Sequence, residues 1–416
     1  MHTYQKPHRS WPLRLLHGLG SVLPLDRVPF LHLDADALVA KAEQQTGLRH
    51  WGDRRFRDPF DRLVESLRTE AHLHPTGRYY FHQYLLRLLT NRLQLQACWQ
   101  AHPEILQVPL VRPLFVVGMY RSGTTFLHNL LAEDPQSQWL PVWQGLYPCA
   151  EPDGADPTGD RRIQKALEHL AFQNSLAPNF STAHHIDAQR PAECSRLFEH
   201  SFVGHLFDFR VGVPTYSQWL LDQDLRSAYQ EYRQQLQLLS WAKVGAEHQP
   251  HWVLKAPAHI FALDSLLETF PDAAIVYLHR DPIEVLPSCC SLATLGRSRF
   301  TDHPQPLDPP AIGCHWLEVL SEGIRRADGV CQQVQDAGGQ GVYHLQYRDL
   351  LRDPLGQIRQ IYDYFGYAMG DAFEAKIHGW IQANPQHKRG VHRYSLEQFG
   401  LDPQQVNAAF KGTQGG

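Results

Sequence analysis

Short apolar runs and longer amphipathic segments alternate along the second part of this 416-residue chain. Four of the apolar runs are bounded by glycine, proline or charged residues, and they span residues 114–117, 252–254, 274–278 and 342–345. Such runs are typical of strands buried on both faces of a parallel sheet, whose strands are joined by helices. The pattern therefore predicts an α/β fold, with a parallel β-sheet flanked by helices.

The beginning of the chain carries apolar residues at helical spacing instead. Asp34 precedes the segment LVAKAEQQ, Gly47 ends it, and Pro59 opens the next amphipathic segment. An acidic N-cap, a proline at the first helical position and a glycine after the last turn are all helix signals. We predict a helical N-terminal region, residues 1–110, packed on a core formed by residues 111–416.

Composition narrows the class of protein. Charged residues make up 20% of the chain and the net charge is −4, which argues against a nucleic-acid partner. The seven cysteines are scattered without a C-x-x-C motif, as is usual in a reducing compartment. No run resembles a signal peptide or is long enough to span a bilayer, so a cytoplasmic protein is expected. The segment WPLRLLHGLGSVLPL leaves peripheral membrane contact open.

The first apolar run leads into a loop that resembles a nucleotide-binding P-loop. Gly118 and Gly123 have P-loop spacing, but Thr124 stands where the Walker lysine is expected. Backbone N–H groups at the start of the following helix favour a phosphate. The loop adds one cation and three hydroxyls: Arg121, Ser122, Thr124 and Thr125. Without the lysine, a ligand that lacks a γ-phosphate fits this loop better than a triphosphate.

A second anion-binding element follows the run 274–278. Arg280 stands at the carboxyl end of this predicted strand, where open α/β sheets bind ligands. Ser288 lies about two turns along the helix that Pro282 begins, so both side chains can reach one phosphate. A surface pair between Arg280 and Asp281 is the alternative.

Together, the two elements resemble the sulfotransferases that use 3′-phosphoadenosine 5′-phosphosulfate. The segment RSGTT (121–125) matches the 5′-phosphosulfate loop, and Arg280 with Ser288 matches the 3′-phosphate element. The stretches WVLKAPAHI, PAEC, YRDLLRDP and HRYSLEQFGLD resemble the bacterial-type branch. Many cytosolic members have lysine where Arg121 stands, so Arg121 is the natural substitute.

The resemblance implies a P-loop NTPase-like fold with the helical region as an N-terminal extension. It also implies in-line sulfuryl transfer, without a metal, to a hydroxyl or amine of a small-molecule, lipid or glycan acceptor. Two other readings stay open: a P-loop kinase or NTPase, and a non-catalytic nucleotide-binding protein. The acceptor pocket is expected in the N-terminal and 140–250 regions. Aromatic residues in or next to the second region are Trp139, Trp143, Phe172, Phe180, Phe198 and Phe202. The sequence predicts no oligomeric state.

Catalytic roles follow from the resemblance and from position. Arg121 suits the leaving phosphate, and Lys255, at the end of the run 252–254, suits the sulfuryl oxygens. Glu193 is the first candidate for the general base, because relatives use carboxylates or histidines there; His184 and His185 follow in that order. The alternative for Glu193 is charge complementation in the first turn of a helix that begins at Pro191.

Three further residues are weaker candidates for ligand binding. The stretch Lys388–Arg389–Gly390 resembles a late basic stretch of cytosolic relatives, which makes Arg389 a second candidate for the 3′-phosphate. Trp316 and Tyr347 have the chemistry to stack on adenine, although core packing is the more ordinary role for each.

Overall fold

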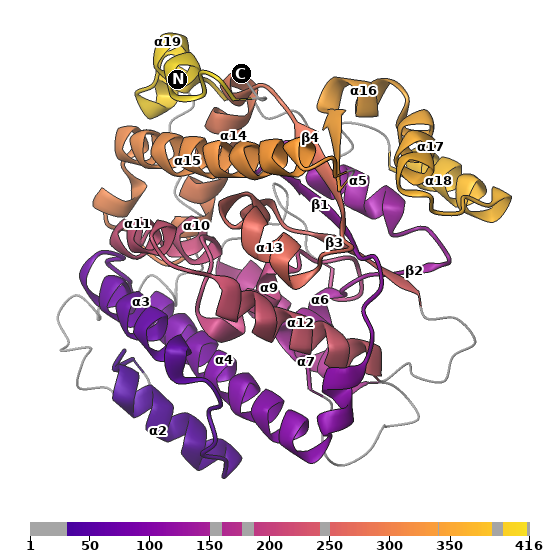
Figure 1. Ribbon diagram of the computed structural model, residues 1–416. Coiled ribbons are helices and arrows are strands. Elements are labelled where there is room, and N and C mark those ends of the chain that lie inside the picture. The colour runs from indigo at the N-terminus through magenta and orange to yellow at the C-terminus, as the bar shows by residue number, and fades with distance from the viewer. Residues whose placement is uncertain are drawn as a thin grey trace.

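The computed structural model describes residues 31–149, 160–176, 187–241, 250–339, 341–384 and 394–413. Five parallel strands form one sheet in the order β2-β3-β1-β4-β5 (Figure 1). Their bounds are β1 Leu114–Gly118, β2 Ser137–Gln138, β3 His251–Lys255, β4 Ala274–His279 and β5 Val342–Gln346. The four predicted strands and their parallel pairing are confirmed, and each extends the apolar run by one or two residues. Strand β2 was not predicted because its two residues form no apolar run.

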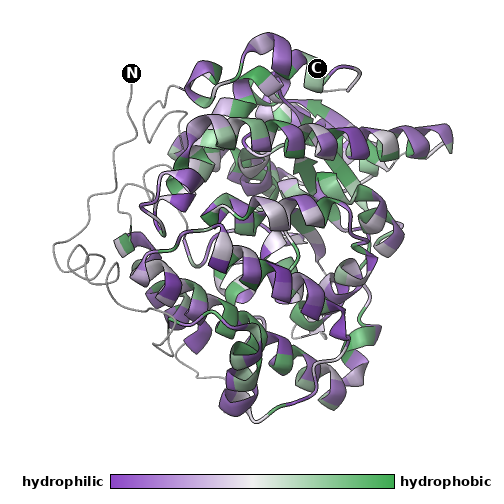
Figure 2. Ribbon diagram, turned by 90° about the vertical axis from the view of Figure 1, so that its left-hand side faces the viewer, coloured by the Kyte–Doolittle hydropathy of each residue, from purple (hydrophilic) through white to green (hydrophobic). Residues whose placement is uncertain are grey.

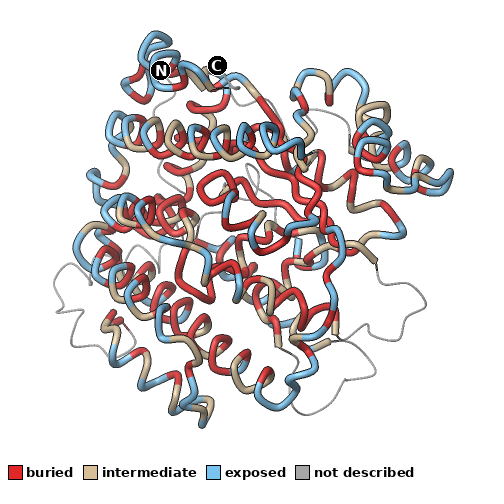
Figure 3. Tube along the Cα trace, in the orientation of Figure 1, coloured by how far each residue is buried: buried red, intermediate tan, exposed pale blue. Residues whose placement is uncertain are grey.

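The strands are apolar because both faces of the sheet are covered. All five residues of β1 are buried, and successive side chains point to opposite faces. Leu114 and Val116 join an apolar cluster with α5, α16, α17 and α18, whose bounds are Thr124–Leu131, Tyr347–Arg352, Pro354–Phe365 and Asp371–Ala383. Phe115 and Val117 join the larger cluster on the other face. The buried strands lie between helices with polar outer sides (Figures 2 and 3).

The larger cluster is built by helices from most of the chain. Its helices near the sheet are α9 Ser195–Phe198, α10 Leu206–Val211, α11 Pro214–Leu221, α12 Arg226–Trp241, α13 Leu263–Thr269, α14 Pro282–Arg297, α15 Pro309–Asp336 and α19 Pro403–Ala409. Helices α6 Val142–Leu146 and α7 Arg161–Leu176 pack together beside it. The N-terminal helices α2 Ala35–Thr46, α3 Arg57–Thr69 and α4 Pro75–Ala101 contribute to the same apolar cluster. The described helices before residue 110 therefore share this apolar cluster, while the division of the chain at residue 110 stays a prediction.

The predicted helix signals act at α2, and one of them is shifted at α3. Asp34 accepts a hydrogen bond from the Ala37 N–H at 2.8 Å, and Gly47 ends α2 with a φ of +69°. Helix α3 begins at Arg57, so Pro59 is its third residue and not its first. The first and the third helical positions both lie in the first turn, where the missing N–H of a proline breaks no intrahelical bond. Within the described ranges, no helix combines the length and apolar composition that crossing a bilayer requires.

Candidate active site

The loop between β1 and α5 has a backbone that requires its two glycines. Gly118 has a φ of +145°, and a Cβ there would lie 2.5 Å from the Leu278 carbonyl oxygen of the neighbouring strand. Gly123 has a φ of +100°, and a Cβ there would lie 2.5 Å from the Tyr347 ring. Arg121 also adopts a positive φ, +71°, an unusual conformation for a residue with a side chain. The loop is therefore strained and tightly packed, as anion-binding loops often are.

The three hydroxyls of the loop are not equivalent. Ser122 is fully buried, and its Oγ donates to the Met119 carbonyl at 2.7 Å, so it shapes the loop. Thr124 is buried and Thr125 is exposed. Because α5 begins at Thr124, the N–H groups of Thr124 and Thr125 have no intrahelical acceptor and remain available to an anion, whereas the Phe126 N–H donates to the Gly123 carbonyl at 2.9 Å.

Residues from β4 and α14 converge on the same loop. Arg280 Nη1 donates to the Arg121 carbonyl oxygen at 3.0 Å, and Arg121 Nε donates to Ser288 Oγ at 3.1 Å. The Arg280 guanidinium lies 4.4 Å from the centre of the Tyr347 ring and pairs with Glu284 at 3.1 Å. The three predicted phosphate-binding side chains thus lie together, although 159 and 167 residues separate Arg121 from its two partners.

Arg280 and Asp281 do not pair with each other in the structure, so the alternative interpretation of Arg280 is wrong. Asp281 is the N-cap of α14 and accepts from the Ile283 N–H at 2.9 Å. Tyr347 is half-buried beside Gly123 and Arg280, so its role is not core packing. Trp316, in contrast, is completely buried in the core and has no surface for adenine.

Lys255 links the loop to Glu193. It ends β3, next to β1, and its side chain is only 3% exposed. Its Nζ donates to Thr125 Oγ1 at 3.2 Å and to Glu193 Oε1 at 2.7 Å. Glu193 is 25% exposed, so one side of the pair remains open to a ligand. The arrangement places a cation and a carboxylate at the start of α5.

The prediction that Pro191 begins a helix containing Glu193 is wrong. Helix α9 begins at Ser195, and Pro191 forms an isolated bridge with Pro141. The intervening segment is held extended because the Ala192 N–H donates to the Leu140 carbonyl at 2.7 Å and the Cys194 N–H donates to the Lys255 carbonyl at 2.9 Å. Glu193 therefore faces Lys255 because of these two backbone bonds, and dipole complementation does not explain it.

Two buried histidines contact the segments that carry Lys255 and Glu193. His128 of α5 is 1% exposed, and its Nε2 lies 3.3 Å from the Val253 carbonyl of β3. Burial, together with the Lys255 charge, lowers the pKa of His128 to about 3, so the ring is neutral. His259 lies 3.3 Å from Cys194 Sγ and 2.8 Å from the Tyr229 hydroxyl, and burial lowers its pKa to about 3 as well. The sequence around His128 and His259 did not predict these contacts.

Some predicted residues lie outside the described ones: Phe180, His184, His185 and Arg389. Among the described residues, no group of three or more histidine, cysteine or acidic side chains is arranged to hold a metal ion.

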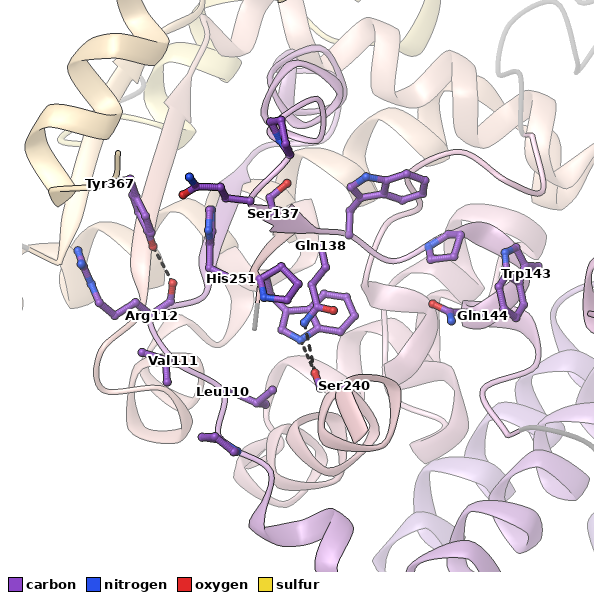
Figure 4. Close-up of a pocket in the computed structure, with 17 residues that line it drawn as sticks. Leu110, Val111, Arg112, Ser137, Gln138, Trp143, Gln144, Ser240, His251 and Tyr367 are labelled. Atoms are coloured by element: carbon purple, nitrogen blue, oxygen red, sulfur yellow. Dashed lines mark hydrogen bonds between the residues drawn. The ribbon is translucent and has the colours of Figure 1, made fainter. Parts of the chain in front are cut away.

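A separate cavity of about 980 Å³ lies near the amino ends of β1 and β3 (Figure 4). Its lining includes Leu110, Arg112 and His251, which lie before or at the beginning of β1 and β3, whereas the loop follows the carboxyl end of β1. Trp139 and Trp143 line this cavity, while Phe198 and Phe202 are buried in the core. The aromatic residues predicted for the acceptor pocket therefore do not line one pocket: some line this cavity and others are buried in the core.

The fold and the site define a P-loop-like protein whose cations converge on the carboxyl edge of a parallel sheet. A family model described as "Sulfotransferase family" matches residues 113–371. The chain belongs to this family, and it is an enzyme that transfers sulfuryl groups. The fold, the family and the activity predicted from the sequence are thus confirmed.

Mycobacterial proteins are among its relatives. The chain is 25% identical over 295 residues to "Omega-hydroxy-beta-dihydromenaquinone-9 sulfotransferase Stf3" of Mycobacterium bovis and of Mycobacterium tuberculosis, covering 70% of this chain and 71% of the relative. The crystal structure of sulfotransferase STF1 from M. tuberculosis H37Rv matches with a TM-score of 0.75 and 30% identity, covering 91% and 98% of the two chains. Sulfotransferase STF9 from Mycobacterium avium matches with a TM-score of 0.78 and 28% identity, covering 91% and 95%.

Proposed function

We propose that the chain transfers the sulfuryl group of 3′-phosphoadenosine 5′-phosphosulfate, the donor that its family implies. In this proposal the loop from Gly118 to Thr125 binds the 5′-phosphosulfate. Arg280 and Ser288 bind the 3′-phosphate, and Arg121 lies between the two phosphates. The contacts of Arg121 with both Arg280 and Ser288 support one continuous anion site.

The bridge that Lys255 makes between Thr125 and Glu193 carries the catalytic part of the proposal. Lys255 donates to an oxygen of the sulfuryl group or to the oxygen that leaves with the phosphate, as charge develops there. Donor oxygens then compete with Glu193 for Lys255. A carboxylate that loses its cationic partner becomes a stronger base, because the cation had favoured its charged form.

Glu193 is then the base for the transfer step. The acceptor hydroxyl oxygen forms a bond to sulfur, and the bond from sulfur to the 5′-phosphate oxygen breaks. The hydroxyl proton passes to Glu193, and the products are a sulfate ester and 3′-phosphoadenosine 5′-phosphate. In-line geometry is supplied by the loop, which holds the donor, and by Glu193, which approaches from the side of β3.

The acceptor in this proposal is a hydroxyl on a largely apolar molecule. The relatives named Stf3 act on a hydroxylated dihydromenaquinone. Near Glu193, Tyr120 packs against Phe209 with ring centres 4.9 Å apart, so apolar side chains lie close to the proposed base. His184, His185 and Arg389 remain further proposals for acid–base and phosphate contacts.

Calorimetry with 3′-phosphoadenosine 5′-phosphate and with ATP, each with and without magnesium, tests the donor. We expect the bisphosphate to bind without the metal and more tightly than ATP. A preference for ATP with magnesium would favour a kinase or NTPase. Binding of the bisphosphate without turnover of labelled donor on any acceptor would favour a non-catalytic nucleotide-binding protein.

A further inference from the structure

A group of arginines that takes no part in the donor site includes Arg196, which lies one turn after Glu193. The Arg196 N–H donates to the Glu193 carbonyl at 3.3 Å, and the Arg196 stem packs on α6, because a Cβ at Gly145 would lie 3.1 Å from its Cδ. Arg87 of α4 reaches the same helix, where its Nη1 donates to the Leu146 carbonyl at 2.7 Å. The two guanidinium groups therefore approach α6 from different elements.

Arg210 of α10 completes this group. It donates to the Tyr84 hydroxyl and pairs with Glu199 at 2.7 Å, and Tyr84 donates to the other oxygen of Glu199 at 2.5 Å. The Tyr84 ring lies between two of the arginines, 5.1 Å from the Arg87 guanidinium and 5.2 Å from that of Arg210. We call Arg87, Arg196 and Arg210 the arginine cluster.

The arginine cluster is short of negative charge within the described residues. Three guanidinium groups face one carboxylate, Glu199, so two positive charges are unbalanced. The Nε and Nη2 atoms of Arg87 are buried without a hydrogen-bond partner, and the Arg196 guanidinium makes no hydrogen bond or ion pair with the described residues. The three arginines are half-buried, and unbalanced charge at such positions is costly, so these guanidinium groups suit oxyanions.

The pKa shifts of the groups in and around the arginine cluster agree with a positive electrostatic potential there. Burial, together with repulsion from Arg210 and Arg87, lowers the pKa of Arg196 despite the attraction of Glu199. Burial and the positive charges of Arg87, Arg196 and Arg210 hold the pKa of His169 well below its usual range, so His169 adds no charge. The Tyr84 hydroxyl stays neutral because burial raises its pKa.

Apolar surface adjoins the arginine cluster. Tyr80 stacks on Tyr84 with ring centres 5.7 Å apart, and Phe172 packs on Tyr80 at 6.3 Å. Phe172 and Tyr79 are 37% and 40% exposed and pack edge to face, so aromatic rings continue from the surface to the arginines.

We propose that the arginine cluster binds an oxyanion of the acceptor, a carboxylate or a phosphate, so that the acceptor is an apolar molecule with both a hydroxyl and a negative charge. This inference rests on the proposed function for the identity of the ligand as acceptor. Arg196 is the specificity-determining residue, because its guanidinium has no hydrogen-bond or ion-pair partner among the described residues and it lies closest in the chain to Glu193.

Binding of matched small probes tests the inference. Phenyl phosphate, phenylacetate and neutral phenylacetamide are titrated into protein saturated with 3′-phosphoadenosine 5′-phosphate, so that the donor site is occupied. We expect each anion to bind at least about tenfold more tightly than the amide, as a desolvated guanidinium contact implies. Arg196→Met keeps the packing of the stem and is expected to remove most of this preference. Arg352→Met, at a side chain that is 77% exposed, is the control and leaves the preference unchanged.

Folding is checked on the same variants. Arg196→Met loses no hydrogen bond to the part of the chain that the structure describes and relieves repulsion, so its thermal midpoint is expected to stay the same or to rise. Arg87→Met is the second variant and is also expected to lower the preference. Equal binding of anions and amide, or a preference that survives in both variants, overturns the inference. The bisphosphate titration separates this outcome from failure of the proposed function, which predicts donor binding whatever the probes do.

Discussion

The salt bridge between Glu193 and Lys255 makes it possible to separate a general base from a purely structural partner. In Glu193→Gln the amide oxygen still accepts a hydrogen bond from Lys255, but it neither balances the charge nor takes a proton at neutral pH. Lys255 is 3% exposed and Glu193 is 25% exposed. Breaking a buried pair by removing one partner costs about 3–5 kcal/mol, and because glutamine keeps the bond and Glu193 is partly solvated, we expect about 2 kcal/mol of lost unfolding stability.

Turnover and donor binding are expected to respond in opposite directions. Loss of a general base lowers kcat by roughly 10²–10⁴-fold. Loss of the carboxylate also removes a repulsion of about 1 kcal/mol toward a phosphate near Lys255, so the bisphosphate is expected to bind roughly fivefold more tightly. The assays are turnover with labelled donor, calorimetry with 3′-phosphoadenosine 5′-phosphate, and denaturant unfolding.

A matched control is Glu374→Gln. Glu374 of α18 is 29% exposed and pairs with Arg359 of α17 at 2.6 Å, so its exposure and ion-pair distance match those of Glu193, while its partner is 51% exposed and lies away from the site. We expect this variant to keep wild-type turnover and bisphosphate binding. Near-normal kcat in Glu193→Gln, or weaker bisphosphate binding in it, would refute the assignment of Glu193 as base and favour a role in holding Lys255.

Three other changes test the loop and its support. Arg280→Ala is expected to weaken bisphosphate binding roughly 10–100-fold, as loss of a charged hydrogen bond implies, and calorimetry measures it; an unchanged Kd would remove Arg280 from the site. Gly123→Ala is expected to abolish bisphosphate binding, because its φ of +100° and the Tyr347 ring 2.5 Å away exclude a Cβ; wild-type binding in the same titration would contradict this. His128 has a folded pKa of about 3, so the unfolded chain binds more protons below pH 6.5 and the stability contribution of neutral His128 is lost as pH falls toward 3. Between pH 7 and 5, His128→Gln is therefore expected to lose about 2 kcal/mol less stability than wild type in denaturant unfolding, and parallel pH curves would count against it.

The parts of the site that sequence predicted well are those determined by local pattern. An apolar run followed by two glycines predicts a strand and an anion-binding loop, because few other residues tolerate φ values of +145° and +100°. Arg280 and Lys255 were found because they follow apolar runs, and the carboxyl ends of parallel strands meet at one edge. Each of these inferences needs only a short window of sequence.

The parts that sequence missed depend on contacts between distant segments. Glu193 was placed on a helix because Pro191 is a good first residue, but backbone bonds to Leu140 and Lys255 hold the segment extended. The unbalanced arginines are also invisible in sequence, because Arg87, Arg196 and Arg210 come from three separate helices. A pattern read along the chain carries no information on which of the many arginines share one buried space.

The structure also offers a physical account of the missing Walker lysine. Thr124 is 3% exposed, so a lysine at that position would have to leave the packed start of α5 to reach a ligand. The cations come instead from neighbouring strand ends. Lys255 of β3 reaches Thr125 from one side of β1, and Arg280, which directly follows β4, reaches the Arg121 carbonyl from the other. Because β1 lies between β3 and β4 in the sheet, the strand order itself distributes positive charge on both sides of the loop. We infer that a donor with two separated phosphates suits this distribution better than a triphosphate, which needs its cation at the end of a single phosphate chain.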